Sequence, residues 1–413
     1  MSLRPRRSAL LSVLVVLALP ALAGQAQAAA APPALTSPAC SNQVATAPTL
    51  PGPAPTTVAV PGSPFGVAIA PGGRTAVVSL VGGQSTLAIL AMGEGAPRLL
   101  RTVSVLGSQQ ATGMAVSHDG RFLAVTLATD TAVLSLPALL AGAPDPVLGA
   151  LADQGRGTIE AVFSADDRFV FISDENSSAI SVFDLGRALA RGFSAPGVAV
   201  GQVPVDIAPV GLALSPNGRL LYATSELASL SGPFQGTLAV VDVEKAERSP
   251  ATSVLVRVDA GCSPVRVALS DGGRLAWVSA RGSDDLLAFD TDRLRRDPAH
   301  ALVAIVPVGL QPVGVLVTNG GRDVLVADSG RFSSPNTPQT VSVVDARAAL
   351  AGRPALLGTI PAGDFPREFG LDRATGQVVL TNFNSGTVET FQVPFRDRDP
   401  LASRPASQRV SEG

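Results

Sequence analysis

A short pattern recurs seven times along the chain and constrains its fold more than any other feature. In each copy an apolar run leads into a tight turn, built from Gly, Asp or Asn and followed by Arg, and a second apolar run comes next. Six turns keep this form and the seventh, at 374–377, is degenerate; the turns end at Arg74, Arg121, Arg168, Arg219, Arg274, Arg322 and Gln377. A period of roughly 50 residues is typical of repeat architectures, so the repeats predict one large domain.

Four strands are predicted in each copy, and the third copy shows them in order. The β-branched and aromatic runs that turn residues bound lie at 161–163, 169–172, 179–183 and 198–200. The first two runs are apolar at consecutive rather than alternate positions, which indicates sheets buried on both faces. Helical segments are expected in three later connections, at 185–191, 294–296 and 346–351.

The two ends of the repeat region complete each other. The last copy stops after its third strand, at 387–393, and the region opens with a lone strand at 57–60. Pairing these two segments closes the ring and removes an exposed sheet edge. The sequence therefore predicts an all-β fold, a seven-bladed β-propeller of four-stranded blades over residues 56–395, closed by an N-terminal strand that completes the last blade.

The flanking segments differ from the repeats. Residues 1–28 have a basic start, a short apolar run and a small-x-small cleavage pattern, which predicts a signal peptide and an exported protein, periplasmic or extracellular. We expect an Ala/Pro-rich flexible segment at 29–55 unless Cys40 is anchored, and a polar tail at 396–413. No membrane span is expected after signal removal. Cys40 and Cys262 are bridged or stay two separate thiols, and export favours the bridge.

Charge and missing motifs narrow the function. The net charge is −2, and Lys245 is the only lysine, so no basic footprint for nucleic acid is present. The chain has two histidines and lacks the signatures of nucleotide, haem and serine-hydrolase sites. We therefore expect no cofactor and no metal site.

One copy carries a family resemblance. The segment 209–222, with Pro-x-Gly, an apolar run and Ser-Pro-Asn-Gly-Arg-x-Leu-Tyr, resembles the YVTN repeat, and 365–369 with 380–388 is similar to the closing blade of lactonase-like propellers. The resemblance implies membership of the YVTN / lactonase-like seven-bladed β-propeller family, which includes lactone hydrolases, a cycloisomerase and exported proteins without assigned chemistry. The cycloisomerases use a histidine as acid/base catalyst. Here His118 and His300 are predicted on the opposite face of the ring, so no such role carries over.

A column of equivalent positions at the channel mouth provides the main site candidates. It contains Gly66, Gly113, Glu160, Gly211, Arg266, Gly314 and Glu368. We expect the four glycines to leave room there, and the three charged residues, with neighbouring Arg367, to converge. They form either a ligand site with a carboxylate base or a structural ion-pair plug.

The loops after the second strand of each copy carry a second set of polar residues. Asp174 and Asn382 are ligand candidates there, together with Glu175, Asn176, Asp284 and Asp328, although Asp and Asn are also common in turns. The long loops 226–235 and 329–339 are candidate contacts for a partner. We predict a monomeric binding or interaction module for an unknown small molecule or protein partner; the alternative is a lactonase-like hydrolase or isomerase of a small oxygenated substrate.

Overall fold

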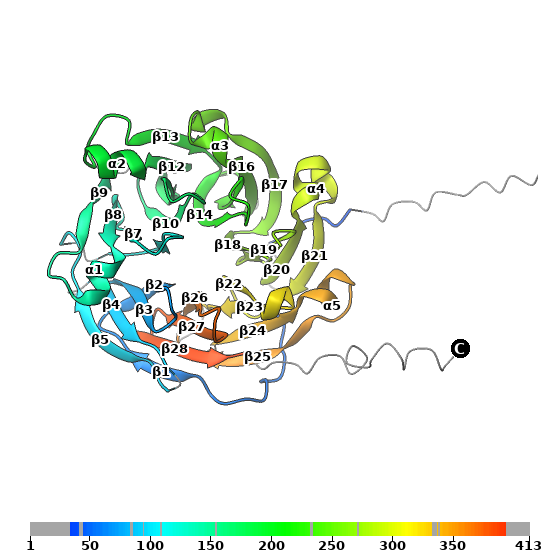
Figure 1. Ribbon diagram of the computed structural model, residues 1–413. Helices are drawn as coiled ribbons and strands as arrows, with labels where there is room; N and C mark the ends of the chain where they lie inside the picture. The colour runs from blue at the N-terminus through cyan, green and yellow to red at the C-terminus, as the bar shows by residue number, and fades with distance from the viewer. Residues whose placement is uncertain are drawn as a thin grey trace, which may run out of the picture. The chain divides into compact units, whose positions relative to one another are not determined.

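Seven four-stranded antiparallel sheets form a closed ring, which Figure 1 shows. The computed structural model describes residues 34–40, 44–82, 86–93, 95–107, 110–152, 155–231, 234–270, 272–332, 337 and 339–393. The predicted signal peptide and the polar tail at 396–413 lie outside these residues. Within each blade the strands are called a to d, from the ring axis outward.

The blades follow one another in chain order. Blade 1 consists of β2 (Ser63–Ile69), β3 (Thr75–Val81), β4 (Leu87–Ala91) and β5 (Arg98–Val103), and blade 2 consists of β6 (Met114–Val116), β7 (Phe122–Thr126), β8 (Asp130–Ser135) and β9 (Val147–Ala152). Blade 3 consists of β10 (Thr158–Phe163), β11 (Phe169–Asp174), β12 (Ala179–Asp184) and β13 (Ala199–Pro204). Blade 4 consists of β14 (Ile207–Leu214), β15 (Leu220–Leu227), β16 (Gln235–Asp242) and β17 (Val254–Cys262).

The remaining blades keep this plan. Blade 5 consists of β18 (Pro264–Leu269), β19 (Leu275–Ala280), β20 (Asp285–Asp290) and β21 (Leu302–Pro307). Blade 6 consists of β22 (Pro312–Thr318), β23 (Asp323–Asp328), β24 (Gln339–Asp345) and β25 (Leu356–Ala362). Blade 7 consists of β26 (Pro366–Leu371), β27 (Gln377–Asn382), β28 (Thr387–Gln392) and β1 (Thr56–Ala59).

The predicted ring closure is confirmed. Strand β1 pairs antiparallel with β28, with Val58 opposite Val388 and Thr56 opposite Thr390. The hydroxyls of the two threonines lie 2.7 Å apart, within hydrogen-bonding distance. The N-terminal strand is thus the outermost strand of blade 7 and covers what would otherwise be an open sheet edge.

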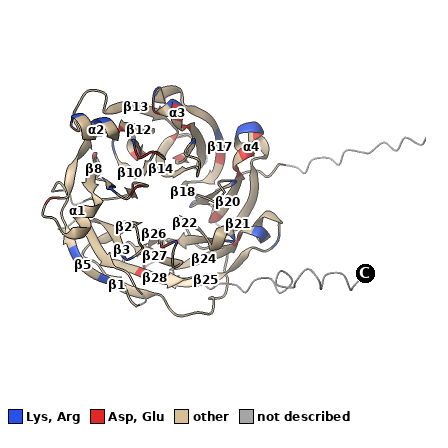
Figure 2. Cartoon of the chain, in the orientation of Figure 1, with Lys and Arg blue, Asp and Glu red and all other residues tan. Residues whose placement is uncertain are grey.

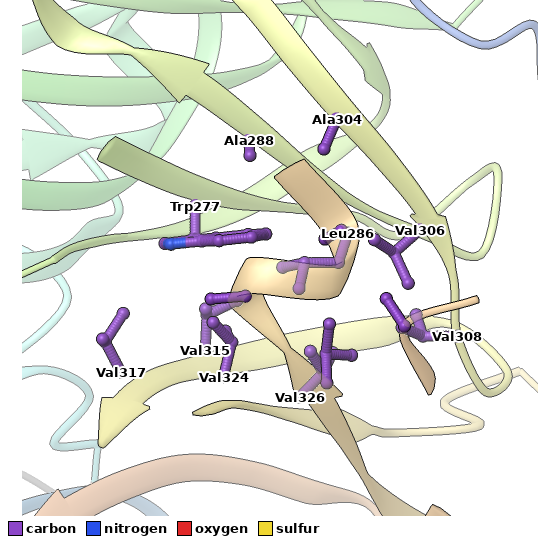
Figure 3. Close-up of a cluster of buried hydrophobic side chains, with 14 of the residues drawn as sticks. Trp277, Leu286, Ala288, Ala304, Val306, Val308, Val315, Val317, Val324 and Val326 are labelled. Carbon is purple, nitrogen blue, oxygen red and sulfur yellow. The ribbon is translucent and has the colours of Figure 1, made fainter. Parts of the chain in front are cut away.

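The hydrophobic core lies between neighbouring blades. Figure 3 shows Trp277 and Leu286 of blade 5 packed against Val315, Val324 and Val326 of blade 6. Strand β11 has all six residues buried, as the consecutive apolar pattern of the sequence predicts. Each blade therefore depends on both neighbours for burial of its faces.

Short helices occupy five of the connections between strands c and d. They are α1 (Leu136–Ala141), α2 (Leu185–Arg191), α3 (Val243–Ala246), α4 (Thr291–Arg296) and α5 (Ala346–Leu350). The aspartate that ends the preceding strand accepts backbone N–H hydrogen bonds at the start of each of the last four helices, at Asp184, Asp242, Asp290 and Asp345. Figure 2 shows charges of both signs on these connections and few on the strands.

An N-terminal segment runs along the outside of blades 4 to 6 before it reaches β1. A disulfide joins Cys40 to Cys262 at the end of β17. The Ser37 hydroxyl accepts the Gly261 N–H at 2.7 Å, and further along Leu50 donates its N–H to the Thr359 carbonyl at 2.8 Å. The described part of the predicted flexible segment is therefore held at several points. No helix among the described residues is long and apolar enough to cross a bilayer.

Candidate functional site

Hydroxyl side chains on strand b fix the inner strands around the axis. In five blades the hydroxyl accepts the N–H of a strand a residue, in the pairs Gly66–Ser79, Glu160–Ser173, Gly211–Thr224, Arg266–Ser279 and Glu368–Thr381. Several of these hydroxyls also donate to a carbonyl of the next blade; Thr224 donates to Val265 at 2.7 Å, and Thr381 donates to Phe65 across the closure at 3.1 Å. The predicted column therefore stands on a rigid frame.

A cavity of about 350 Å³ opens at the axis on the face formed by the b–c loops and d–a connections. Its apolar base comes from strand a, where Val210, Val265 and Val313 form a cluster with Phe365. The phenyl rings of Phe365 and Phe383 lie 5.3 Å apart between centroids, and both line the cavity. The cluster gives the cavity an apolar base at the centre of the ring.

Charged residues form part of the wall of this cavity. Carboxylates come from blades 3 and 4, and guanidinium groups come from blades 5, 6 and 7; the charged lining residues are Glu175, Glu226, Arg266, Arg281, Arg331 and Arg367. Arg281 and Glu226 form an ion pair at 2.7 Å, so these two charges satisfy each other. The other charged lining residues are one carboxylate, Glu175, and three guanidinium groups, those of Arg266, Arg331 and Arg367.

Arg367 is the most unusual of these residues. It is 8% exposed, and its guanidinium carbon lies 3.4 Å from the ring centroid of Phe65, where a cation–π contact stabilises it. Within the described part of the chain its Nε has no hydrogen-bond partner and its guanidinium forms no ion pair. Burial, followed by the nearby charge of Arg266, holds the pKa of Arg367 well below its ordinary value. The charge of Glu368 opposes this shift without forming an ion pair with Arg367, and an anionic ligand in the cavity would reduce the remaining cost of burying the cation.

Arg331 lies at the rim of the same wall. Its guanidinium carbon is 5.2 Å from the ring centroid of Phe332 and 5.8 Å from that of Phe365. No described residue forms an ion pair with it. Arg331 and Arg367 thus offer two cationic groups, each beside an aromatic ring, on one side of the cavity.

Glu160, Arg266 and Glu368 converge, as the column predicts. The Arg266 Nε lies 2.9 Å from Glu368 Oε2 and 3.7 Å from Glu160 Oε2. Arg266 also donates to the Val210 carbonyl at 3.0 Å, and Glu160 accepts the Leu212 N–H at 3.0 Å. Arg266 lines the cavity, but neither carboxylate does. The three residues therefore join blades 3, 5 and 7 behind the cavity.

The pKa values of Glu160 and Arg266 are both raised, which favours the neutral form of the carboxyl and the charged form of the guanidinium. Burial raises the pKa of Glu160 to about 7; Arg266 opposes this increase and the charge of Glu368 adds to it. Burial would lower the pKa of Arg266, but Glu368 and Glu160 outweigh it and raise that pKa. Arg266 stays charged, and Glu160 can exchange a proton near neutral pH.

Of the candidates after strand b, Glu175 lines the cavity, whereas the others lie outside its lining: Asp174, Asn176, Asp284, Asp328 and Asn382. Asp174 accepts from the Ser181 hydroxyl at 2.6 Å, and the Asn382 amide donates to the Thr387 hydroxyl at 3.2 Å. Asp284 accepts the Gln311 N–H, and Asp328 accepts from the hydroxyls of Thr340 and Ser342. These residues hold loops together around the site.

Several lining residues were not identified from the sequence as site residues; Glu226, Arg331 and Phe332 belong to the loops 226–235 and 329–339, which the sequence indicates only as partner contacts. Glu226, Arg281 and Phe383 come two positions after the strand b hydroxyl of their blades, as Glu175 does. This second column was detectable in the repeat, because equivalent positions of a repeat fold lie at equivalent radii.

The two histidines bind aspartates at a distance from the cavity. His118 Nδ1 lies 2.7 Å from Asp167, and His300 Nδ1 lies 2.9 Å from Asp297. Among the described residues no group of three or more His, Cys, Asp or Glu side chains has the arrangement of a metal site.

Comparisons with known proteins support the fold. No family model matches the chain, and no curated protein matches it either. Among solved structures the chain is similar to hydrazine synthase of Kuenenia stuttgartiensis, with a TM-score of 0.65 and 17% identity. That match covers 82% of this chain and 98% of the other. At such low identity the likeness supports the β-propeller fold alone.

Proposed function

We propose that this β-propeller is a binding module whose cavity takes a small carboxylate with an apolar body. The observation that carries the proposal is the buried guanidinium of Arg367, which lines the cavity and forms no ion pair with a described residue. A ligand carboxylate would supply a charge-assisted hydrogen bond there, and Arg331 would supply a second contact. Hydrogen bonds of this kind are among the stronger ones in proteins.

The remaining lining suits the rest of such a ligand. The base of Val210, Val265 and Val313 offers apolar contact, and the aromatic rings of Phe365 and Phe383 border it. A cavity of about 350 Å³ is within the usual range for small-molecule sites. We therefore favour a compact ligand with one acidic group over an extended polymer.

Calorimetric titration with 3-phenylpropanoate and its uncharged amide tests this proposal. The wild type should bind the acid and bind the amide much more weakly. Arg367→Gln should lower the affinity for the acid about tenfold, as expected when a charged hydrogen bond is lost. The control is Arg353→Gln, an exposed arginine after α5, which should bind like the wild type. Equal affinity for acid and amide would contradict the proposal, and so would unchanged binding by Arg367→Gln.

A lactonase-like activity is the second candidate, and the position of Glu175 favours it. This carboxylate lines the cavity, and burial, followed by the charge of Glu226, raises its pKa. A general base needs such a pKa and a place beside the substrate. The assay measures this activity as the acid released from simple γ- and δ-lactones, which is recorded by titration for the wild type and for Glu175→Gln. Equal rates in the two proteins would exclude Glu175 as the base.

We propose further that the chain is exported through the leader at 1–28. The Cys40–Cys262 disulfide is consistent with this location, because such bonds persist in oxidising compartments. Expression of the full chain in a bacterial host, with cell fractionation and mass measurement, tests it. Recovery of uncleaved protein from the cytoplasm would contradict export.

A further inference from the structure

The charges that line the cavity are separated across the ring axis. Glu175 belongs to blade 3, whereas Arg331 and Arg367 belong to blades 6 and 7. In a ring of seven, blade 3 lies opposite the junction of blades 6 and 7, which Figure 1 shows for β10, β22 and β26. The cavity thus has an acidic side and a basic side with an apolar base between them.

Internal pairing accounts for the other charges. Arg281 pairs with Glu226, and Arg266 pairs with Glu368 and Glu160 behind the wall. Glu175, Arg331 and Arg367 form no ion pair with any described residue. Three unpaired charges of two signs therefore remain around one cavity.

From this separation we infer that the ligand is a small zwitterion, an α-amino acid or short peptide with an apolar side chain. Its carboxylate contacts Arg367 and Arg331, its ammonium group contacts Glu175, and its side chain lies on Val210, Val265 and Val313. This inference rests on the proposed function and adds the ammonium group. Burial, followed by the charge of Glu226, raises the pKa of Glu175, and an ammonium group beside the carboxylate would offset both effects.

Three matched probes separate the two groups of the ligand: L-phenylalanine, 3-phenylpropanoate, which lacks the ammonium group, and 2-phenylethylamine, which lacks the carboxylate. Titration calorimetry is done at pH 7.5 with wild type, Glu175→Gln and Arg353→Gln. The wild type should bind phenylalanine about tenfold more tightly than either analogue, since each analogue leaves a charged wall group unpaired. Glu175→Gln should lose about tenfold for phenylalanine and nothing for 3-phenylpropanoate.

The outcomes distinguish this inference from the proposed function. If 3-phenylpropanoate binds wild type as tightly as phenylalanine does, the carboxylate site stands and the zwitterion is refuted. If Glu175→Gln weakens both ligands equally while its thermal unfolding matches the wild type, the ammonium contact is also refuted. If none of the carboxylates binds, the proposed function and the inference fail together.

Discussion

Glu160 should make the stability of the propeller depend on pH. Burial raises its folded pKa to about 7, whereas an unfolded chain has the ordinary glutamate value near 4.5. The folded state therefore favours the protonated form. The stabilising contribution is complete below about pH 4.5 and is lost as pH rises through 7. The difference in pKa corresponds to about 3 kcal/mol of unfolding free energy.

Glu160→Gln tests this expectation because the amide cannot ionise. Arg266 keeps its 2.9 Å contact to Glu368 in this variant, so the guanidinium still has a carboxylate partner. Between pH 5 and pH 8 the wild type should lose about 3 kcal/mol more stability than the variant does. Burial also raises the pKa of Asp328 to about 7 and that of Asp285 to about 6. Both proteins share these two groups, so the difference between them isolates Glu160.

The assay is urea unfolding followed by far-ultraviolet circular dichroism at several pH values. The slope against denaturant concentration should stay equal in both proteins, which shows that the unfolded states are comparable. Parallel pH profiles for wild type and variant would refute the reasoning. A variant less stable than the wild type at pH 8 would also refute it, because Glu160 would then stabilise the fold as an ionised partner of Arg266.

Three further changes test the frame around the site. Arg266→Met leaves Glu368 and Glu160 without their cation and should cost about 3–5 kcal/mol in urea unfolding; a cost below about 1 kcal/mol would contradict the buried ion-pair description. Deletion of residues 56–62 exposes the edge of β28 and should cost several kcal/mol in thermal unfolding, so an unchanged melting temperature would disprove the closure argument. Replacing Cys40 and Cys262 by serine removes a link across 222 residues and should cost about 3–5 kcal/mol; thiol labelling of unreduced, denatured wild type should find no free cysteine.

The overall ring was predictable because its signals are local and repeated. The turns set the period, and the missing fourth strand of the last copy points to the lone strand that begins the domain. The N-terminal bounds differ by one residue, 57–60 predicted and Thr56–Ala59 observed. The contacts of residues 34–40 and 44–50 with blades 4 to 6 were not predictable, because a segment outside the repeat carries no period and contacts partners far away in sequence.

The site was predictable only in part, and the reason lies in the backbone of strand a. The Arg266 column converges, but most of the apolar lining comes from the preceding position, which Arg367 also occupies: Phe65, Ile159, Val210, Val265 and Val313. Strand pairing shifts within strand a of six blades, for example between Pro264 and Val267. Such a bulge redirects side chains near the axis, so simple alternation along the strand does not say which residues face the cavity.

The small size of the column glycines suggests that they leave room at the channel mouth, but the structure gives them a different role. A Cβ on Gly113 would lie 2.3 Å from the Ile159 carbonyl oxygen, and one on Gly211 would lie 2.4 Å from that of Val265. These glycines therefore allow close contact between blades, and they do not leave room for a ligand. Gly113 also packs against the backbone of Glu160, and Gly211 packs against that of Arg266. The glycines of blades 2 and 4 thus let the strand that carries Glu160 or Arg266 pack closely against the preceding blade.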